Sequence, residues 1–404
     1  MSSRAALLSL EQARRQLLAS IAPLTDTEMV SLASALDRVA AADIAASIPV
    51  PPWDNAAMDG YALRRADLEQ TPTLPVSQRV AAGMQPDPLQ PGTAARIFTG
   101  APVPDHADTV VMQENCEQQN GQVTVVQLPE RGENIRRQGS DISAGSKLIE
   151  KGQRLGPFQL GLLASTGIDQ VPVVAKPKVA LLMTGDELVE PGLTLTPGKI
   201  FNSNQYVIQA LCQRMGIDVV ASDHVVDSLD ATVSALSQAA EKANVIITMG
   251  GVSAGEEDHV KDAVSREGEL LLWKLAIKPG KPFAFGRFAD SHFFGLPGNP
   301  VSAVVTLLLL VRPALLKLMG AAETDWPERW VEAGFSRDQV SDREEYLRVS
   351  LKSTPEGDVV QPFSRQSSGV LSSLGQSDGL AVIPKGNKVK KGDRLRFLAF
   401  NAIF

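Results

Sequence analysis

Cysteine and histidine are scarce in this sequence of 404 residues, which contains two of the former and four of the latter. Cys116 and Cys212 lie far apart in unlike contexts, so the sequence excludes a disulfide framework and a cysteine-rich zinc site. The histidines never show metal-ligand spacing, and we find no Ser–His–Asp or Cys–His constellation. We therefore expect a protein of the reducing cytoplasm whose chemistry depends on other residue types.

The sequence also lacks a basic excess and a long hydrophobic run. Its 39 Lys+Arg against 46 Asp+Glu give a formal net charge of −7, which argues against a nucleic-acid partner. The most apolar run, residues 301–311, is shorter than the ~18 residues that span a membrane, and Arg312-Pro313 closes it. We expect no membrane segment, and we interpret this run as a buried core helix.

The first part of the chain predicts one domain interrupted by another. Residues 1–52 read mainly as helical, because Ser9 and Gln12 resemble a capping box and the apolar spacing predicts a second helix over 31–42. Residues 53–139 hold short β-like runs bounded by turn residues and predict an inserted β domain. Residues 140–176 return to a helical pattern, so we expect them to join 1–52 in a discontinuous helical and mixed domain.

The second half predicts an α/β domain followed by a β domain. Residues 177–325 alternate apolar strands with helices, which is typical of a parallel sheet covered on both faces. Residues 326–404 contain five short strand-like runs that fit a small barrel or sandwich. The predicted fold class is thus multidomain, α/β plus β, and ligands of such parallel sheets bind at the carboxyl ends of the strands.

Acidic side chains follow three consecutive predicted strands of the α/β domain. These are Asp186-Glu187, Asp227 and the run Glu256-Glu257-Asp258. Carboxylates gathered at one rim repel each other unless a hard cation binds between them. A single loop carboxylate is usually solvated, but three at successive strand ends predict a Mg²⁺ site.

A glycine-rich loop follows one of these strands. Gly250, Gly251 and Ser253 lie between a predicted strand and a helix that starts near Asp258. Bare glycines let backbone N–H groups approach a phosphate, although a simple tight turn remains the alternative. The spacing is neither that of a Walker A loop nor that of a dinucleotide fingerprint.

Lys274, Lys278 and Lys281 form a basic segment bracketed by prolines. If residues 274–277 are a strand, Lys274 and Lys278 project from the same face. The proline and glycine brackets favour a pre-shaped anion site over a solvated basic surface. Such a segment beside a metal site suits a nucleotide or another polyanionic ligand.

Two further segments are dense in turn-forming residues. In the loop from Pro297 to Pro300, Asn299 is a natural N-cap and Pro300 suits the first helical turn, which predicts a pocket wall or a plain helix start. The segment PPWDNAAMDGYA carries a lone acid, Asp59, and is otherwise a domain-linking turn.

Together these segments resemble one protein family. The strings PPWDNAAMDGYA, FTGAPVP, RRQGSDI, TGDELVEPG, GKIFNSN, TMGGVSAGEEDHVKD, KLAIKPGKPFAFG and FGLPGNPVS occur in this order. They are similar to the molybdopterin molybdenumtransferases of the MoeA family, which includes the E domain of gephyrin. The resemblance covers essentially the full chain and weakens after about residue 320.

The resemblance implies a fold and a reaction. It implies elongated homodimers of four-domain subunits, with a three-layer, MogA-like α/β domain that faces other domains across a cleft shared between subunits. It implies that adenylylated molybdopterin and molybdate are the substrates, that AMP is released, and that Mg²⁺ is required. The implied partners are molybdopterin adenylyltransferase and acceptor or carrier proteins of the molybdenum cofactor.

The resemblance also implies site residues. Those expected to be catalytic are Asp59, Asp227, Asp258, Lys274 and Lys278, and the metal ligands are Glu187, Asp227 and Asp258. The glycine-rich loop and the basic segment described above add Gly250, Gly251, Ser253 and Lys281 as substrate-binding residues. Those that the resemblance implies to bind substrate are Thr99, Asp141, Glu187, Pro297, Pro300, Arg348 and Ser368. Arg343 and Ser367 are the alternatives for the last two.

Two other functions compete with this prediction. A molybdopterin adenylyltransferase shares the α/β domain, but the additional domains and the PGNP motif argue against it. A gephyrin-like scaffold would have no reason to keep Asp59, Asp258 and Lys274 together.

Overall fold

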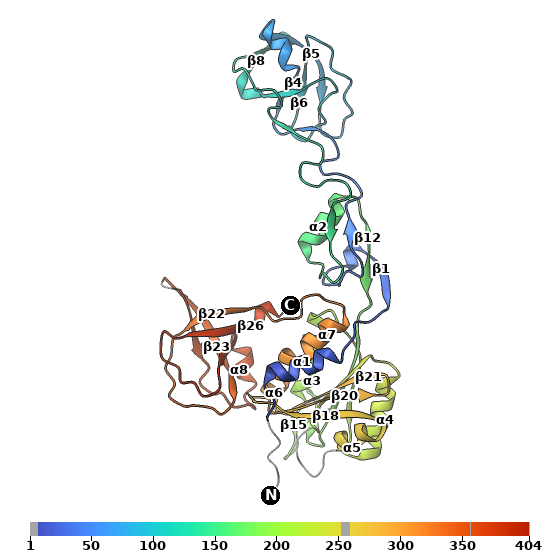
Figure 1. Cartoon of the computed structure of the whole chain (residues 1–404), viewed down its shortest axis with the longest axis vertical. Coiled ribbons are helices and arrows are strands. Elements are labelled where there is room, and N and C mark those ends of the chain that lie inside the picture. The colour runs from blue at the N-terminus through green and yellow to red at the C-terminus, as the bar shows by residue number, and fades with distance from the viewer. Residues whose placement is uncertain (1–6, 252–258, 356, 404) are drawn as a thin grey trace.

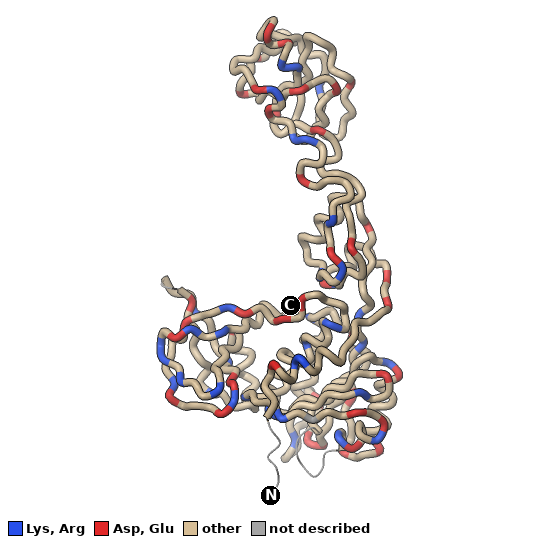
Figure 2. Tube along the Cα trace, viewed as in Figure 1, with Lys and Arg blue, Asp and Glu red and all other residues tan. Residues whose placement is uncertain are grey.

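A computed structural model describes residues 7–251, 259–355 and 357–403. The molecule is elongated: a small β domain lies at one end, a narrow section follows, and an α/β sheet and a β barrel lie side by side in a broad base (Figure 1). Acidic and basic residues are interspersed along the whole length (Figure 2). The predicted fold class is confirmed, and the domain boundaries given above stay predictions.

The distal β domain is built around a sheet of order β7-β4-β6-β5-β9-β8. Alternating side chains of its strands supply two cores, with Tyr61 and Leu63 in one and Ala62 in the other. The short pair β3 and β10 lies at its base. The strands are β3 (Asn55–Ala56), β4 (Gly60–Leu63), β5 (Thr73–Val80), β6 (Ala94–Ile97), β7 (Thr109–Met112), β8 (Cys116–Gln119), β9 (Gln122–Val125) and β10 (Ile135–Arg136).

The narrow section consists of two antiparallel pairs and one helix. Strand β1 (Thr27–Ser31) pairs with β12 (Gln170–Val174), and β2 (Ile44–Ala45) pairs with β11 (Lys147–Ile149). Helix α2 (Pro157–Ser165) packs beside them. This part therefore joins chain segments on both sides of the inserted β domain.

The helix predicted over residues 31–42 is wrong. Only a short 3₁₀ turn, Leu32–Ser34, follows β1. Asp37 has a φ of 63°, a left-handed conformation that a right-handed helix cannot contain. The apolar spacing instead reflects burial on a strand-and-turn segment whose backbone pairs with distant residues, as when Leu32 N donates to Asp169 O.

The α/β sheet is only partly parallel. Its order is β16-β13-β17-β21-β20-β18; the first four strands are parallel, and β20 runs antiparallel to both of its neighbours, β21 and β18. The strands are β13 (Lys178–Thr184), β16 (Asp218–Val225), β17 (Val245–Met249), β18 (Gly268–Lys274), β20 (Pro282–Phe288) and β21 (Ser291–Leu296). The predicted parallel sheet is present and is extended by an antiparallel part, because only Ala289 and Asp290 connect β20 to β21, which forces a hairpin.

Helices cover both faces of this sheet, as predicted. Val179, Leu181 and Met183 belong to the large core that also contains α1 (Leu10–Ala19) and α3 (Ser203–Arg214). Ala180 and Leu182 face the core that contains α4 (Leu229–Ala240) and α5 (His259–Glu267). The predicted capping box at the start of α1 is present, with Ser9 and Gln12 as the reciprocal partners.

A continuous helix, Pro300–Leu318, runs through the large core. It is long and apolar enough to cross a membrane, with a mean hydropathy of 2.0, but 94% of that window is buried inside the protein. The predicted core helix is thus confirmed, whereas the expected end at Arg312-Pro313 is wrong. The helix continues because η4 (Leu307–Val311), a π-helical turn between α6 (Pro300–Thr306) and α7 (Arg312–Leu318), widens the backbone before the proline ring.

The C-terminal strands close into a barrel, since β23 pairs with both β24 and β25 around the ring β23-β24-β22-β26-β25. The strands are β22 (Glu328–Ala333), β23 (Glu344–Thr354), β24 (Gly357–Pro362), β25 (Gly379–Ile383) and β26 (Arg394–Ala399), and a short helix, α8 (Ser372–Gly375), precedes β25. A sixth strand, β19 (Ile277–Lys278), adds to β23 in parallel. The basic segment therefore leaves the α/β sheet and joins the barrel.

This path overturns the expected arrangement of Lys274 and Lys278. Lys274 ends β18 and pairs with Pro282 in the α/β sheet, whereas Lys278 pairs with Glu345 in the barrel sheet. The strand stops at Lys274 because Leu275 N donates to Lys281 O and closes a loop. The two lysines consequently do not share one strand face.

We predict that Leu310→Ala destabilises the fold strongly. Leu310 is fully buried in the large core around the long helix, so its truncation leaves a cavity costing about 2–5 kcal/mol. Leu195, which is 46% exposed, provides the matched control Leu195→Ala. Urea unfolding followed by circular dichroism should show a lower midpoint for the first variant alone. Equal midpoints would contradict the central position assigned to this helix.

Candidate active site

The first cavity lies at the carboxyl ends of three parallel strands. We call it the sheet-edge pocket; it has a volume of about 660 Å³ and is lined by Thr184, Glu187, Gly250, Gly251, Pro297 and Pro300, among others. Thr184 ends β13, and Met249 and Leu296 end β17 and β21. The pocket is therefore at the position where ligands bind in open α/β sheets.

Glycine is required where the backbone approaches this pocket. Gly250 has a φ of 98°, and a Cβ there would lie 2.8 Å from Thr184 Oγ1. Gly251 has a φ of 64°, and its Cβ would lie 2.4 Å from Val260 Cγ2. Thr184 Oγ1 itself is buried and has no hydrogen-bond partner among the described residues. A narrow glycine turn beside an unpaired hydroxyl suits a hydrogen-bonding ligand.

Two helices begin at the sheet-edge pocket. Asn202 caps α3, and Asn299 occupies the N-cap position of the long helix without forming a capping bond through its side chain. Asn204 Nδ2 donates to Gly298 O at 2.7 Å and ties the two starts together. None of the described lining residues is a lysine or arginine. Attraction of an anion to this pocket would therefore come from the helix starts and from backbone N–H groups, which suit a phosphate.

The predicted acidic residues are only partly brought together. Glu187 is exposed and lines the sheet-edge pocket, while Asp227 N donates to Asp186 Oδ1 at 3.2 Å next to the end of β16. Asp258 and Ser253 lie outside the described residues. Within residues 7–251, 259–355 and 357–403, no group of three side chains has metal-ligand geometry.

A second cavity lies on the barrel. We call it the barrel pocket; it has a volume of about 560 Å³ and is lined by Lys278, Arg337, Glu345, Arg348, Gln366 and Ser367, among others. Glu345 has a side chain that is only 2% exposed. Lys278 Nζ lies 2.9 Å from its Oε1, and Arg337 bonds both of its oxygens. The pocket wall thus contains two cations and one buried carboxylate.

These contacts determine the ionisation of Glu345. Burial alone would raise its pKa, but the hydrogen bonds from Lys278 and Arg337 outweigh burial and lower the pKa below its ordinary value. The carboxylate therefore stays charged at neutral pH, and its stabilising contribution is lost only as the pH falls through this lowered pKa.

The side chain of Arg348 stabilises the wall of the barrel pocket through hydrogen bonds to neighbouring residues. Its side chain donates to Ser373 Oγ, Tyr346 O and Ser367 O, and burial lowers its pKa to about 10. Ser367 lines the pocket, whereas Arg343 bonds Ile277 O and does not. Ser368 O accepts from Val301 N at 3.0 Å and fastens this loop to the start of the long helix.

The two pockets share two wall segments. In residues 278–282, Lys278 and Pro279 line the barrel pocket and Pro282 lines the sheet-edge pocket, with the exposed Lys281 between them. In residues 367–371, Ser367 lines the barrel pocket and Gly369 lines the sheet-edge pocket. The sheet-edge pocket, which suits a phosphate, and the barrel pocket, which contains two cations, therefore lie next to each other.

The remaining predicted residues do not line either pocket. Asp59 Oδ1 accepts from Thr99 N and Thr99 Oγ1, both at 2.8 Å, on the distal β domain. Asp141 is exposed where that domain joins the narrow section. Lys274 is exposed at the end of β18, where it pairs with Pro282 beside the sheet-edge pocket. Asp59 adjoins β4 and Thr99 follows β6, and the narrow section separates these strands from the α/β sheet and the barrel, where the two pockets lie (Figure 1).

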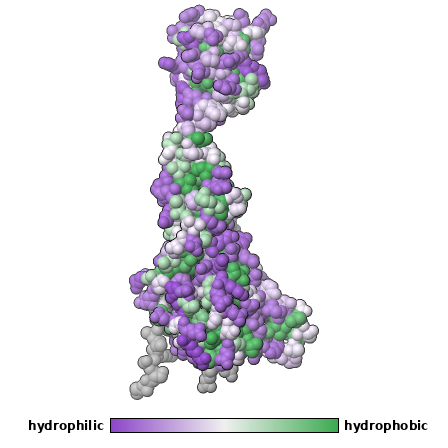
Figure 3. Space-filling view, turned by 90° about the vertical axis from the view of Figure 1, so that its right-hand side faces the viewer, coloured by the Kyte–Doolittle hydropathy of each residue, from purple (hydrophilic) through white to green (hydrophobic). Residues whose placement is uncertain are grey.

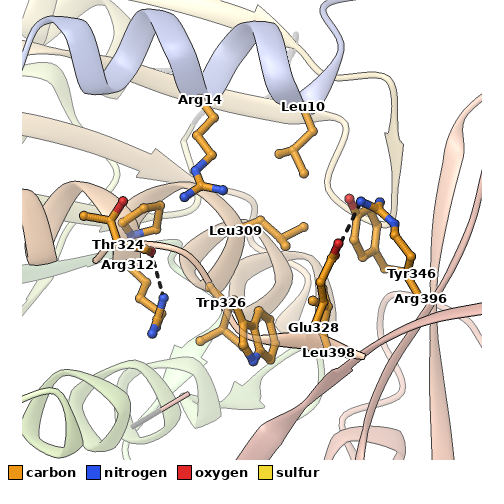
Figure 4. A pocket seen from close by; sticks show the side chains of 12 residues that line it. Leu10, Arg14, Leu309, Arg312, Thr324, Trp326, Glu328, Tyr346, Arg396 and Leu398 are labelled. Atoms are coloured by element: carbon orange, nitrogen blue, oxygen red, sulfur yellow. Dashed lines mark hydrogen bonds and ion pairs between the residues drawn. The ribbon is translucent and has the colours of Figure 1, made fainter. Parts of the chain in front are cut away.

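A third, smaller cavity of about 100 Å³ lies between α1, the long helix and the barrel. Its charged side chains have partners: Glu328 pairs with Arg396 at 3.4 Å, and Arg312 donates to Thr324 O at 3.1 Å (Figure 4). Arg14 pairs with Asp325. This cavity is much smaller than the other two and its charged groups already have partners, so it is a weaker ligand site.

Sequence reasoning missed Arg337, Glu345 and Phe201. Arg337 and Glu345 lie in ordinary β-like sequence without glycine or proline punctuation, and only the pairing of β19 with β23 brings them to Lys278. Phe201 ends the small pair β14 (Leu188–Val189) and β15 (Ile200–Phe201), and it lines the sheet-edge pocket.

Family models match nearly the whole chain. The MoeA N-terminal region (domain I and II) matches residues 8–167, a probable molybdopterin binding domain matches 180–317, and the MoeA C-terminal region (domain IV) matches 331–400. The molybdopterin molybdenumtransferase of Haemophilus influenzae is 38% identical over 401 residues, covering 98% of this chain and 99% of its own. The chain belongs to the MoeA family. It is accordingly a transferase of molybdenum cofactor biosynthesis, a molybdopterin molybdenumtransferase.

Further comparisons agree with this MoeA assignment. The molybdopterin molybdenumtransferase of a Nostoc species is 37% identical over 377 residues, covering 89% of this chain and 86% of its own. The MoeA crystal structure from Pyrococcus horikoshii OT3 superposes with a TM-score of 0.83 at 28% identity, covering 98% of this chain and 100% of that one. The matches outside the molybdopterin-binding domain favour a molybdenumtransferase over an adenylyltransferase.

We predict that Thr99→Val raises the pKa of Asp59, but not fully to its ordinary value. The pKa is lowered first by the backbone N–H of Thr99, which the variant keeps, and then by the hydroxyl, which it loses. NMR titration of the Asp59 carboxyl carbon measures the change. An unchanged pKa in the variant would show that the hydroxyl does not bond the carboxylate.

Proposed function

We propose that this protein inserts molybdenum from molybdate into adenylylated molybdopterin and releases AMP, forming the molybdenum cofactor. The adjacency of the sheet-edge pocket and the barrel pocket is the observation that carries this proposal. One cavity suits the phosphates of an adenylate, and its neighbour suits a small oxyanion. A substrate bound in the sheet-edge pocket would present its reacting end to an anion in the barrel pocket.

The sheet-edge pocket is the proposed adenylate site. Gly250 and Gly251 allow close approach of the backbone, and the starts of α3 and the long helix direct their positive ends at the same space. Phosphate oxygens would replace the water that otherwise solvates these N–H groups. Phe201 supplies an aromatic wall for a planar ring.

The donor set also fits Mg²⁺, which prefers oxygen ligands. The Glu187 side chain has no hydrogen bond or ion pair with a described residue, and Asp227 N bonds the side chain of the adjacent Asp186. Glu187 and Asp227, with Asp258 from outside the described residues, would hold the ion. When bound, it would neutralise phosphate oxygens and act as a Lewis acid during cleavage of the phosphoanhydride.

The barrel pocket is the proposed molybdate site. Lys278 and Arg337 lie on its wall, and Lys278 keeps 42% of its side chain exposed. Hydrogen bonds from charged donors to an oxyanion are the strong ones. Lys281 and the exposed Lys274 would add longer-range attraction for anionic substrates.

We predict that Lys278→Ala weakens molybdate use. Losing one charge-assisted bond should raise the KM for molybdate about 10- to 100-fold. The control is Lys388→Ala, because Lys388 pairs with Asp338 on the outer barrel surface. AMP release from adenylylated molybdopterin at varied molybdate concentration is the measurement. Wild-type kinetics in Lys278→Ala would contradict a molybdate site in the barrel pocket.

A homodimer would complete the site. Asp59 and Thr99 of one chain lie too far along the molecule to reach its own pockets, so a second copy would supply them (Figure 1). The narrow section exposes apolar side chains that suit such contact: Phe158 on α2 is 89% exposed and Met29 is 59% exposed. Figure 3 shows apolar residues on one face of this section.

We predict that Phe158→Glu weakens this dimer. A charge placed on an apolar contact loses its hydration on association, so the variant should dissociate at concentrations where the wild type stays dimeric. Light scattering after size exclusion measures the mass. Val126→Glu on the distal β domain, where Val126 is 66% exposed, is the matched control. A monomeric wild type would contradict the proposal.

We also propose a cytoplasmic location and two kinds of partner. A molybdopterin adenylyltransferase would supply the adenylylated substrate, and acceptor or carrier proteins would take the finished cofactor. The reactive product favours direct transfer over release into solvent.

A further inference from the structure

We propose that Glu345 is a resident counter-anion that weakens oxyanion binding in the barrel pocket by competing for Lys278 and Arg337. The inference rests on the proposed molybdate site and adds a residue that sets its affinity. Glu345 would act through the two cations and is therefore a positioning residue.

The carboxylate of Glu345 is buried more deeply than the cationic groups of Lys278 and Arg337. The side chain of Glu345 is 2% exposed, whereas those of Arg337 and Lys278 are 19% and 42% exposed. Oε1 lies 2.9 Å from Lys278 Nζ and 3.2 Å from Arg337 Nη2, and Oε2 bonds Arg337 Nη1. An oxyanion entering the pocket meets the two cations first and the carboxylate only through them.

The carboxylate cannot move away, but one of the cations can. Glu345 is the second residue of β23, and its backbone is held between two strands, with Lys278 of β19 on one side and Ile383 of β25 on the other. Lys278 carries its charge on a flexible four-carbon stem that reaches solvent. A bound oxyanion would therefore share Lys278 with Glu345 rather than displace the carboxylate.

The charges of the three side chains sum to +1 instead of +2. Binding that is equally strong in the ground and transition states does not accelerate a reaction. A barrel pocket with lower affinity for the oxyanion would still select an anion. It would also let that oxyanion leave the pocket during transfer. The cost is a higher concentration of molybdate needed for half occupancy.

The test is titration of the full-length protein with molybdate alone in a calorimeter. Glu345→Gln keeps the side-chain shape and removes the charge, so molybdate should bind about tenfold more tightly. Glu344→Gln is the matched control, because Glu344 is the preceding residue of β23 and instead bonds Tyr346 and Arg396. In kinetic assays of Glu345→Gln, the KM for molybdate should fall while kcat does not rise.

A second variant covers the case in which Glu345→Gln does not fold. Arg337→Gln should weaken molybdate binding at least about tenfold, because one cation is lost and Glu345 then pairs with Lys278 alone. Unchanged molybdate affinity in Arg337→Gln would show that Arg337 is not a cation for which the oxyanion and Glu345 compete, and would overturn the proposal.

The outcomes separate the two proposals. Unchanged molybdate affinity in both Lys278→Ala and Arg337→Gln would overturn the proposed molybdate site itself. Weaker binding in those two variants together with weaker or unchanged binding in Glu345→Gln would overturn the role of Glu345 alone. Tighter binding in Glu345→Gln with an unchanged Glu344→Gln supports both.

Discussion

The pairing of β19 with β23 is the contact on which the arrangement of the site depends. Residues 277–278 leave the α/β sheet and become the sixth strand of the barrel sheet, and the Lys278–Glu345 ion pair lies across this pairing. A second tie, from Val301 N to Ser368 O, fastens a barrel loop to the start of the long helix. Because both ties border the same space, the sheet-edge pocket and the barrel pocket become neighbours.

The two pockets attract anions by different physical means. The sheet-edge pocket uses helix starts and glycine N–H groups, whose partial charges are fixed in direction and need no counter-ion. The barrel pocket uses full charges, which require compensation when buried, and Glu345 provides it. A long anionic substrate could thus be oriented by dipoles at one end while a small oxyanion is held by cations at the other.

Local signals predicted the elements better than their assembly. The Ser9–Gln12 capping box, the core helix after Pro300 and the five barrel strands follow from residue types within a few positions of each other. The failures at residues 31–42 and at β18 and β20 have one cause: backbone partners far along the chain, or a two-residue connection, decided the structure there. Periodicity alone carries no information about such partners.

The same distinction applies to the site. Gly250, Gly251, Pro297 and Pro300 were predictable because backbone conformation constrains them locally, and all four line one pocket. Arg337 and Glu345 were not, since their role arises from a strand pairing between segments nearly seventy residues apart. The family resemblance predicted Asp59 and Thr99 as site residues. The structure joins the two by hydrogen bonds but places them on the distal β domain, away from both pockets of the same chain.

The most direct test of this account is anomalous diffraction at the molybdenum absorption edge from crystals of the full-length protein soaked in molybdate. The account predicts a molybdenum peak in the barrel pocket, placed so that the oxygens of molybdate accept hydrogen bonds from Lys278 and Arg337. A well-occupied peak confined to any other part of the molecule would contradict it.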